Sequence, residues 1–129
     1  MPRKIVQPKG LFDPRPRYAQ MARAGNTLYL AGQTSINEKG ETVGKGDIEA
    51  QARQVFENLK KALAAEGATF DHVVKLNIYS TNAPVHREPV SKVRRQYFPK
   101  ETVPSTFVGV PALVNPDWLL EIEAIAVLD

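Results

Sequence analysis

The sequence contains no cysteine and only two histidines, His72 and His86. Without cysteine there is no disulfide, no thiolate nucleophile and no zinc–thiolate site, and this absence fits a reducing compartment. The histidines lie 14 residues apart, and neither has a second ligand at the spacing that metal sites use. We therefore expect both histidines to be exposed to solvent, and we expect no metal and no other cofactor.

Long hydrophobic runs are absent too. The longest apolar stretches, Leu28 to Ala31 and Ala124 to Leu128, are far shorter than the roughly 20 residues that cross a bilayer. The segment from Met1 to Leu11 has no apolar core, so we expect no signal peptide. These features favour a cytoplasmic protein without membrane contact.

Basic residues outnumber acidic ones, 17 to 14, which gives a net charge of +3. This excess has two interpretations, a nucleic-acid partner or ordinary surface charge. The basic residues of the first fifth of the chain are Arg3, Lys4, Lys9, Arg15, Arg17 and Arg23. Acidic residues follow them closely, and no aromatic platform accompanies them for stacking bases. The sequence favours ordinary surface charge, so nucleic acid is not an expected partner.

Hydrophobic residues make up 43% of the 129 residues and charged residues 24%, which are globular proportions. No repeat, low-complexity tract or linker divides the chain, so we expect a single domain over residues 1–129. Residues 1–16 hold four prolines and predict an extended arm or edge strand. Strand-like segments at 17–24 and 27–34 flank Gly25-Asn26, a two-residue hairpin signal.

Two helices are predicted. The first runs from about 47 to 66, with Asp47 as the N-cap and Gly67 just beyond the end. Its apolar residues recur every three or four positions and form one stripe: Ile48, Ala52, Val55, Phe56, Leu59 and Leu63. The second helix is weaker and covers roughly 85–98. Pro89 is tolerable there only if it lies in the first turn.

Three more strands are predicted, at 71–80, 104–110 and 119–128, from alternating apolar and polar residues. The full order is β-β-α-β-α-β-β, with the arm as an additional edge. This order predicts an α+β fold in which one mixed sheet of about six strands is backed by two helices on one face. The other face of the sheet is left open.

The last strand indicates what lies on that open face. Strand side chains alternate, so one set points to the helices: Leu120, Ile122, Ala124, Ala126 and Leu128. The opposite set mixes carboxylates with large apolar groups: Leu119, Glu121, Glu123, Ile125 and Val127. Either a second copy of the chain covers this face, or the protein is a monomer in which this face of the sheet is exposed to solvent. The pattern favours a closed homo-oligomer.

The run Leu120–Val127 resembles the C-terminal strand signature of the RidA (YjgF/L-PSP) family. The segments Tyr29–Gln33, Gln51–Leu59 and Val74–Leu76 follow the family pattern in matching order, and the resemblance extends from about residue 3 to residue 128. It implies a chorismate-mutase-like domain that assembles as a barrel-like homotrimer with a small-molecule pocket at each subunit interface. It also implies hydrolysis of reactive enamines and imines such as 2-aminoacrylate.

The resemblance also assigns site residues. The family's pocket tyrosine maps to Tyr18, its strand glycine to Gly32 and its catalytic glutamate to Glu121. Glu121 is expected to act as a general base or to orient the attacking water. The alternative is an interface carboxylate paired with a basic residue of a neighbouring chain.

One family residue does not map. The arginine that clamps the substrate carboxylate falls at Thr106, with Ser105 beside it. Neither hydroxyl makes the bidentate ionic contact of an arginine, although both can donate hydrogen bonds to a ligand. An asparagine of the family's second helix falls near Ser91, which we include among the substrate-binding residues. Arg94 is a candidate for supplying the missing charge from another direction.

Three functions follow as hypotheses. The first is a deaminase-type hydrolase of a small enamine or imine, with its substrate preference altered by loss of the arginine. The second is a non-catalytic trimer that binds a small metabolite. The third is RNA binding or endoribonuclease activity, for which the sequence lacks a suitably placed pair of histidines.

Overall fold

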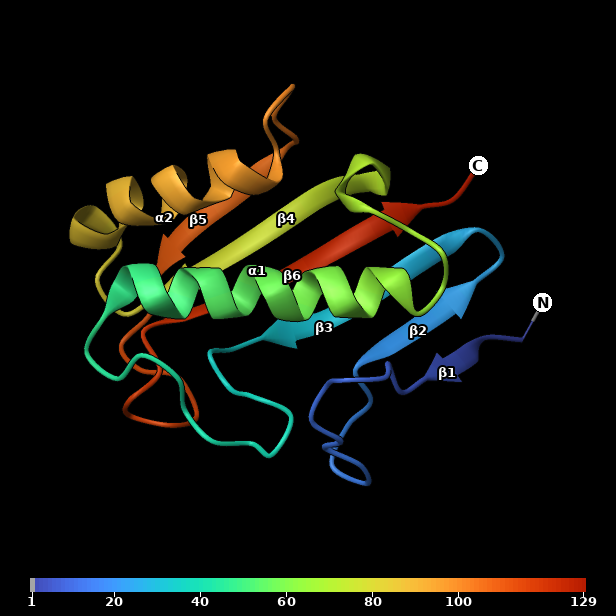
Figure 1. Cartoon of the computed structure of the whole chain (residues 1–129), viewed down its shortest axis with the longest axis horizontal. Coiled ribbons are helices and arrows are strands. Elements are labelled where there is room, and N and C mark those ends of the chain that lie inside the picture. The colour runs from blue at the N-terminus through green and yellow to red at the C-terminus, as the bar shows by residue number, and fades with distance from the viewer. Residues whose placement is uncertain (1) are drawn as a thin grey trace.

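A six-stranded mixed sheet carries two α-helices on one of its faces in the computed structural model, which describes residues 2–129 (Figure 1). The elements follow in the order β1 (Lys4–Val6), β2 (Met21–Ala24), β3 (Thr27–Gln33), α1 (Ile48–Ala64), the 3₁₀-helix η1 (Phe70–His72), β4 (Val73–Ser80), α2 (Ala83–Tyr97), β5 (Ser105–Gly109) and β6 (Leu120–Val127). The predicted α+β class and the order of its elements are confirmed. The proline-containing arm supplies β1 as an edge strand.

The last strand of the chain lies inside the sheet. The strand order is β1-β2-β3-β6-β4-β5, and β6 is antiparallel to both β3 and β4. Only β4 and β5 are parallel, and α2 forms the crossover between them. Figure 1 shows α1 crossing β6 and β3, with α2 over β4 and β5. This topology places residues of β6 next to residues of β3 that are far away in sequence.

Helix α1 forms as the sequence predicts. The Asp47 side chain accepts a hydrogen bond from the Ala50 N–H at 3.0 Å and caps the helix. The apolar stripe is fully buried at Ala52, Val55, Phe56, Leu59 and Leu63. Burial of this stripe against α2, β6 and β3 is the main stabilisation of the helix.

Helix α2 differs from the prediction at its start. It begins at Ala83, so Pro84 occupies the first turn and Pro89 lies well inside the helix. The expectation that Pro89 lies in the first turn is therefore wrong. Pro89 has no N–H to donate to the carbonyl four residues earlier. The helix nevertheless continues, because Val90 and Val93 are buried against the rest of the core.

Neither histidine is fully exposed, contrary to the prediction. His86 is only 8% exposed, and its Nδ1 lies 2.6 Å from Ser80 Oγ at the end of β4. Burial holds the pKa of His86 below its ordinary value. The early start of α2 places His86 beside the sheet. His72 is partly buried, and its Nδ1 accepts a hydrogen bond from the Thr69 N–H at 3.0 Å.

The alternation predicted for the last strand is confirmed. Leu120, Ile122 and Ala126 are fully buried under the helices, whereas Val127 on the opposite face is 42% exposed. No helix of residues 2–129 covers that opposite face (Figure 1). Tyr29, the partner of Ile125 in the neighbouring strand, is 51% exposed there. The open face thus combines carboxylates with exposed apolar side chains.

Among residues 2–129, no helix combines the length and the apolar composition that crossing a membrane requires.

Candidate functional site

A cavity of about 870 Å³ lies where the loop before β2, the end of β3 and the start of β6 meet. Three of the predicted site residues, Tyr18, Gly32 and Glu121, line this cavity together. Residues 12–17 of the loop form one side. The remaining lining residues are Ala31, Thr34, Ile36, Gly40, Val114 and Trp118.

The Glu121 carboxyl group occupies the space that a side chain at position 32 would fill. The pairing of β3 with β6 shifts register between Leu30 and Gln33, which places Gly32 over Glu121. A Cβ added to Gly32 would overlap the Glu121 carboxylate and lie 2.8 Å from its Cγ. A glycine inside a strand often marks such a close approach. Only a residue without a side chain fits beside Glu121 in this arrangement.

The Glu121 carboxyl group is partly buried, and no hydrogen bond or ion pair within residues 2–129 engages it. Burial raises its pKa above the ordinary value, and the nearby negative charge of Glu123 raises it further. A carboxyl group with a raised pKa and no hydrogen-bond partner among residues 2–129 is a candidate for general acid–base chemistry.

Glu123 points to the same face but is engaged by neighbours. Tyr79 donates its phenolic O–H to Glu123 Oε1 at 2.5 Å, and Asn77 Nδ2 lies 3.5 Å from the same oxygen. The hydrogen bond to Glu123 is the main reason why the pKa of Tyr79 is raised. The two carboxylates on this strand therefore differ in their surroundings, because Glu123 accepts hydrogen bonds from neighbouring side chains and Glu121 has no such partner among residues 2–129.

Two opposite charges, those of Glu121 and Arg17, act on Tyr18 at the cavity. Tyr18 is 49% exposed, and its pKa is raised mainly by burial. The negative charge of Glu121 raises this pKa further, whereas the positive charge of Arg17 lowers it. The phenol therefore interacts electrostatically with both groups.

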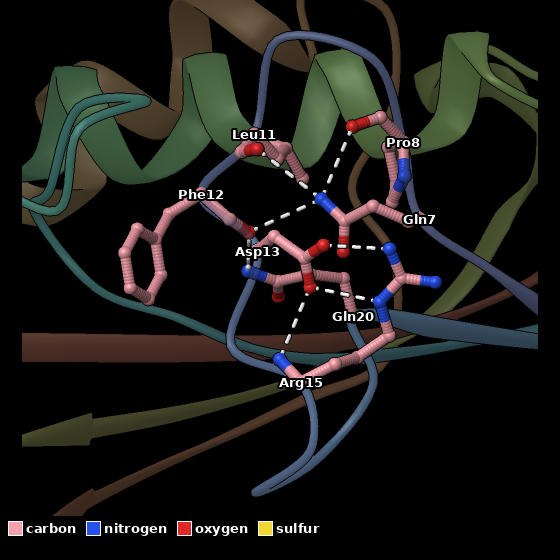
Figure 2. Close-up of polar contacts among 7 residues, drawn as sticks. All are labelled: Gln7, Pro8, Leu11, Phe12, Asp13, Arg15 and Gln20. Carbon is pink, nitrogen blue, oxygen red and sulfur yellow. Dashed lines mark hydrogen bonds and ion pairs between the residues drawn. The ribbon is translucent and has the colours of Figure 1, made fainter.

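The loop that carries Tyr18 is fixed by amide side chains (Figure 2). Gln7 Nε2 donates to the Leu11 and Phe12 carbonyls at 3.2 Å each, and Gln20 Nε2 donates to the Phe12 carbonyl at 3.0 Å. Gln33 Nε2 donates to Gln20 Oε1 at 2.7 Å and so connects the loop to the end of β3. These bonds hold the loop against the strand that carries Gly32.

An ion pair completes this loop. Arg15 donates from Nε to Asp13 Oδ1 at 2.8 Å and from Nη2 to Asp13 Oδ2 at 2.6 Å (Figure 2). These hydrogen bonds hold the pKa of Asp13 down at about 2. The bidentate pair neutralises both charges at the edge of the cavity.

The cavity has an apolar side that the sequence analysis missed. The rings of Phe12 and Trp118 lie there with Ile36. Trp118 Nε1 donates to Thr42 Oγ1 at 3.1 Å, which orients the indole. The Phe12 ring packs so closely on Gly40 that a Cβ there would lie 2.8 Å from it. These residues come from separate loops, and no motif or spacing in the sequence connects them.

Comparison with known proteins identifies the family. The sequence model of the family described as "Endoribonuclease L-PSP" matches residues 10–128.

The chain belongs to the L-PSP (RidA/YjgF) family.

Two relatives are named for their reactions. The 3-aminoacrylate deaminase RutC of Acinetobacter baylyi is 31% identical over 98% of each chain. A 2-iminobutanoate/2-iminopropanoate deaminase of Dermatophagoides farinae is 32% identical, covering 99% of this chain and 98% of its own. Among solved structures, the Rid family protein YyfA of Yersinia pestis superposes with a TM-score of 0.92 at 32% identity, over 98% of this chain and 100% of its own. The fold is thus the L-PSP family fold.

The other predicted site residues do not line the cavity that contains Glu121. Ser105 and Ser91 border a second hollow of about 480 Å³ on the helix side, with Arg94. Arg94 donates from Nη1 to Ser105 Oγ at 2.8 Å and from Nη2 to Thr102 Oγ1 at 2.8 Å. Arg94 is therefore engaged on the far side of the sheet from Glu121.

Thr106 lies on the open face of the sheet. It pairs with Asn77 of β4, which in turn pairs with Glu123 of β6. Its Oγ1 accepts a hydrogen bond from Lys75 Nζ at 3.0 Å. Ser105 and Thr106 thus point to opposite faces, because neighbours along a strand alternate. Within this chain Thr106 shares a face with Glu121 but does not line its cavity.

Among residues 2–129, no three His, Asp or Glu side chains lie close enough together to hold a metal ion.

Proposed function

We propose that this chain is a RidA-type deaminase that hydrolyses a small imine or enamine to a carbonyl compound and ammonia. The observation that carries the proposal is the Glu121 carboxyl group, which is partly buried, unengaged and next to Gly32 in a cavity of about 870 Å³. Similarity to two deaminases over nearly the whole chain supports it.

The proposed reaction is the addition of water to a C=N bond. The water oxygen bonds to the imine carbon while a water proton passes to the Glu121 carboxylate and then to nitrogen. Collapse of the resulting carbinolamine moves its hydroxyl proton to nitrogen through the same carboxyl group, the C–N bond breaks and ammonia leaves. An enamine is first protonated at carbon to give the imine. A carboxyl group with a raised pKa suits both the giving and the taking of protons.

The identity of residue 106 affects which substrates the protein is expected to prefer. At the position where the family pattern has the clamping arginine, this chain has a neutral hydroxyl. An arginine binds a carboxylate through two charge-assisted hydrogen bonds, which threonine does not supply. We propose that substrate preference here differs from that of relatives that carry the arginine.

The open sheet face supports a proposed homotrimer with a small-molecule pocket at each interface. Tyr29 and Val127 are exposed apolar residues on the face that neither helix covers. A second copy of the chain would remove their apolar surface from water, which favours association.

Ammonia release tests the proposed activity. Imines are generated in situ from amino acids by an amino-acid oxidase, and their decay with the protein is compared with spontaneous hydrolysis. Acceleration that scales with protein concentration supports the deaminase. If no imine in a panel of apolar and polar amino acids is accelerated, the deaminase proposal fails. In that case, a melting-temperature shift with small metabolites favours a binding protein, and salt-dependent binding of RNA favours a nucleic-acid function.

A further inference from the structure

Two arginines border the cavity that contains Glu121, and they differ in whether the guanidinium group is paired with a carboxylate. Arg15 is paired in bidentate fashion with Asp13, at 2.6 and 2.8 Å. Arg17 also lines the cavity, but its guanidinium makes no hydrogen bond or ion pair with any residue from 2 to 129. The cavity therefore has one neutralised arginine and one whose charge is available to a ligand.

The position of Arg17 is fixed by its backbone rather than by its side chain. The Arg17 N–H donates to the Pro14 carbonyl at 3.0 Å. Both residues belong to the loop whose Phe12 carbonyl accepts hydrogen bonds from Gln7 and Gln20. Its charge acts on Tyr18, which also interacts with the charge of Glu121. Arg17, Tyr18 and Glu121 thus line one cavity, and the charges of Arg17 and Glu121 both act on Tyr18.

The other basic candidates lie elsewhere. Arg94 is on the helix side of the sheet and is engaged by Ser105, Thr102 and the Val103 carbonyl at 3.0 Å. Lys75 donates to Thr106 and does not line the cavity. Among the residues of the cavity lining, Arg17 is the cation without a partner.

The apolar side of the same cavity has a fixed shape. The Trp118 ring is oriented by Thr42, and the Phe12 ring is packed against Gly40. Ile36 lies with them in the lining. Such a surface accepts an apolar substituent with little loss of side-chain entropy.

Building on the deaminase function proposed above, we propose that Arg17 binds the carboxylate of an imino acid substrate, and that Phe12, Ile36 and Trp118 receive a large apolar side chain of that substrate. The anion-binding role then belongs to the loop before β2 instead of β5. If Arg17 binds the carboxylate, the substrate can carry a carboxylate even though residue 106 is a neutral threonine. Arg17 is a specificity-determining residue in this account, and Glu121 performs the proton transfers.

Kinetics of Arg17→Gln test the carboxylate contact. With the imino acid derived from leucine, we expect KM to rise about tenfold or more while kcat stays within about twofold, because a charge-assisted hydrogen bond is lost in the bound state. The neutral imine of leucinamide is expected to show no change. Arg95→Gln is the matched control, because it removes the same charge from an exposed position on α2.

The apolar side is tested with Trp118→Ala. Wild type is expected to prefer the imine derived from phenylalanine over the one derived from alanine, and the variant is expected to lose most of that preference. An unchanged preference would overturn this part of the inference.

A binding measurement separates this inference from the proposed activity. The keto acid derived from leucine, the product of the reaction, is titrated by calorimetry into wild type and Arg17→Gln. Binding that weakens about tenfold in the variant supports the carboxylate contact, whether or not turnover is detected. Equal affinity, or an equal KM for the leucine-derived imine while Glu121→Gln abolishes turnover, would overturn the role of Arg17 and leave the deaminase standing.

Discussion

Gly32 of β3 lies directly against Glu121 of β6, so closely that a methyl group on Gly32 would occupy the space of the carboxyl group. The two residues are brought together because β6, the last strand of the chain, pairs with β3 inside the sheet. The close approach orients Glu121, whose carboxyl group no other side chain of residues 2–129 holds by a hydrogen bond.

Gly32→Ala is expected to displace the Glu121 carboxyl group and to lower kcat/KM about 100-fold, since displacement of a catalytic group by about 1 Å has an effect of that order. The backbone of Gly32 is not in the left-handed region, so alanine is compatible with its conformation. We expect the melting temperature to change little. Steady-state kinetics and thermal unfolding of the variant measure both quantities.

Gly109→Ala is the control for this variant. The backbone of Gly109 is not in the left-handed region either, and a Cβ there would make only ordinary contacts, the nearest with Ala83 Cβ at 3.6 Å and the Ser80 carbonyl oxygen at 3.8 Å. If Gly32→Ala were as active as Gly109→Ala, Glu121 would not require its present position.

The pH profile of kcat/KM is expected to depend on Glu123. Burial raises the pKa of Glu121 and the negative charge of Glu123 raises it further, so Glu121 ionises at higher pH than an isolated glutamate. If the carboxylate form is the base, activity rises with pH through this raised pKa. Glu123→Gln removes the repulsion and keeps an acceptor for Tyr79, so the acidic limb should move to lower pH. A limb that stays in place or moves to higher pH would contradict the assignment of Glu121 as the base.

Much of this fold could be predicted from the sequence, because α1 and β6 bury regular apolar patterns. The stripe of α1 and the alternation of β6 are both found as predicted. Gly32 and Glu121 could be placed in one site through the family resemblance, since local patterns do not reveal that β3 and β6 are neighbours.

Features that depend on loops could not be predicted in the same way. Arg17 and Trp118 meet at the cavity only because separate loops converge there, and no periodicity encodes that convergence. The burial of His86 depended on where α2 begins, and helix boundaries are set by packing as well as by local signals. Ser105 and Thr106 are neighbours in sequence, but the alternation of side chains along a strand places them on opposite faces of the sheet.

Asn58→Leu is expected to lower both stability and activity. Asn58 Nδ2 donates to the Thr34 and Ile36 carbonyls at 3.1 and 2.9 Å, and both residues line the cavity. Leucine has a similar volume but leaves the buried Ile36 carbonyl without this donor, which costs about 1–3 kcal/mol. Chemical denaturation measures the free energy of unfolding, and Asn82→Leu, at an exposed asparagine, is the control. A variant as stable as the control would show that the two hydrogen bonds contribute little.

Association is expected to depend on Tyr29. Light scattering should give wild type a mass about three times the 14.3 kDa of one chain. Tyr29→Lys places a charge on the open face next to Ile125 and is expected to lower the mass toward that of a monomer. Val85→Lys changes an exposed apolar residue on α2 and should leave the mass unchanged. A monomeric wild type, or a Tyr29→Lys variant of full mass, would count against the proposed interface.

Imine hydrolysis by Glu121→Gln tests directly whether Glu121 performs the proton transfers. Glutamine keeps the shape of the side chain beside Gly32 but does not exchange the proton. We expect kcat to fall about 100-fold or more while the melting temperature is retained, and we expect Glu38→Gln, at an exposed glutamate, to have the activity of wild type. Turnover by Glu121→Gln equal to that of Glu38→Gln would show that Glu121 does not transfer the protons.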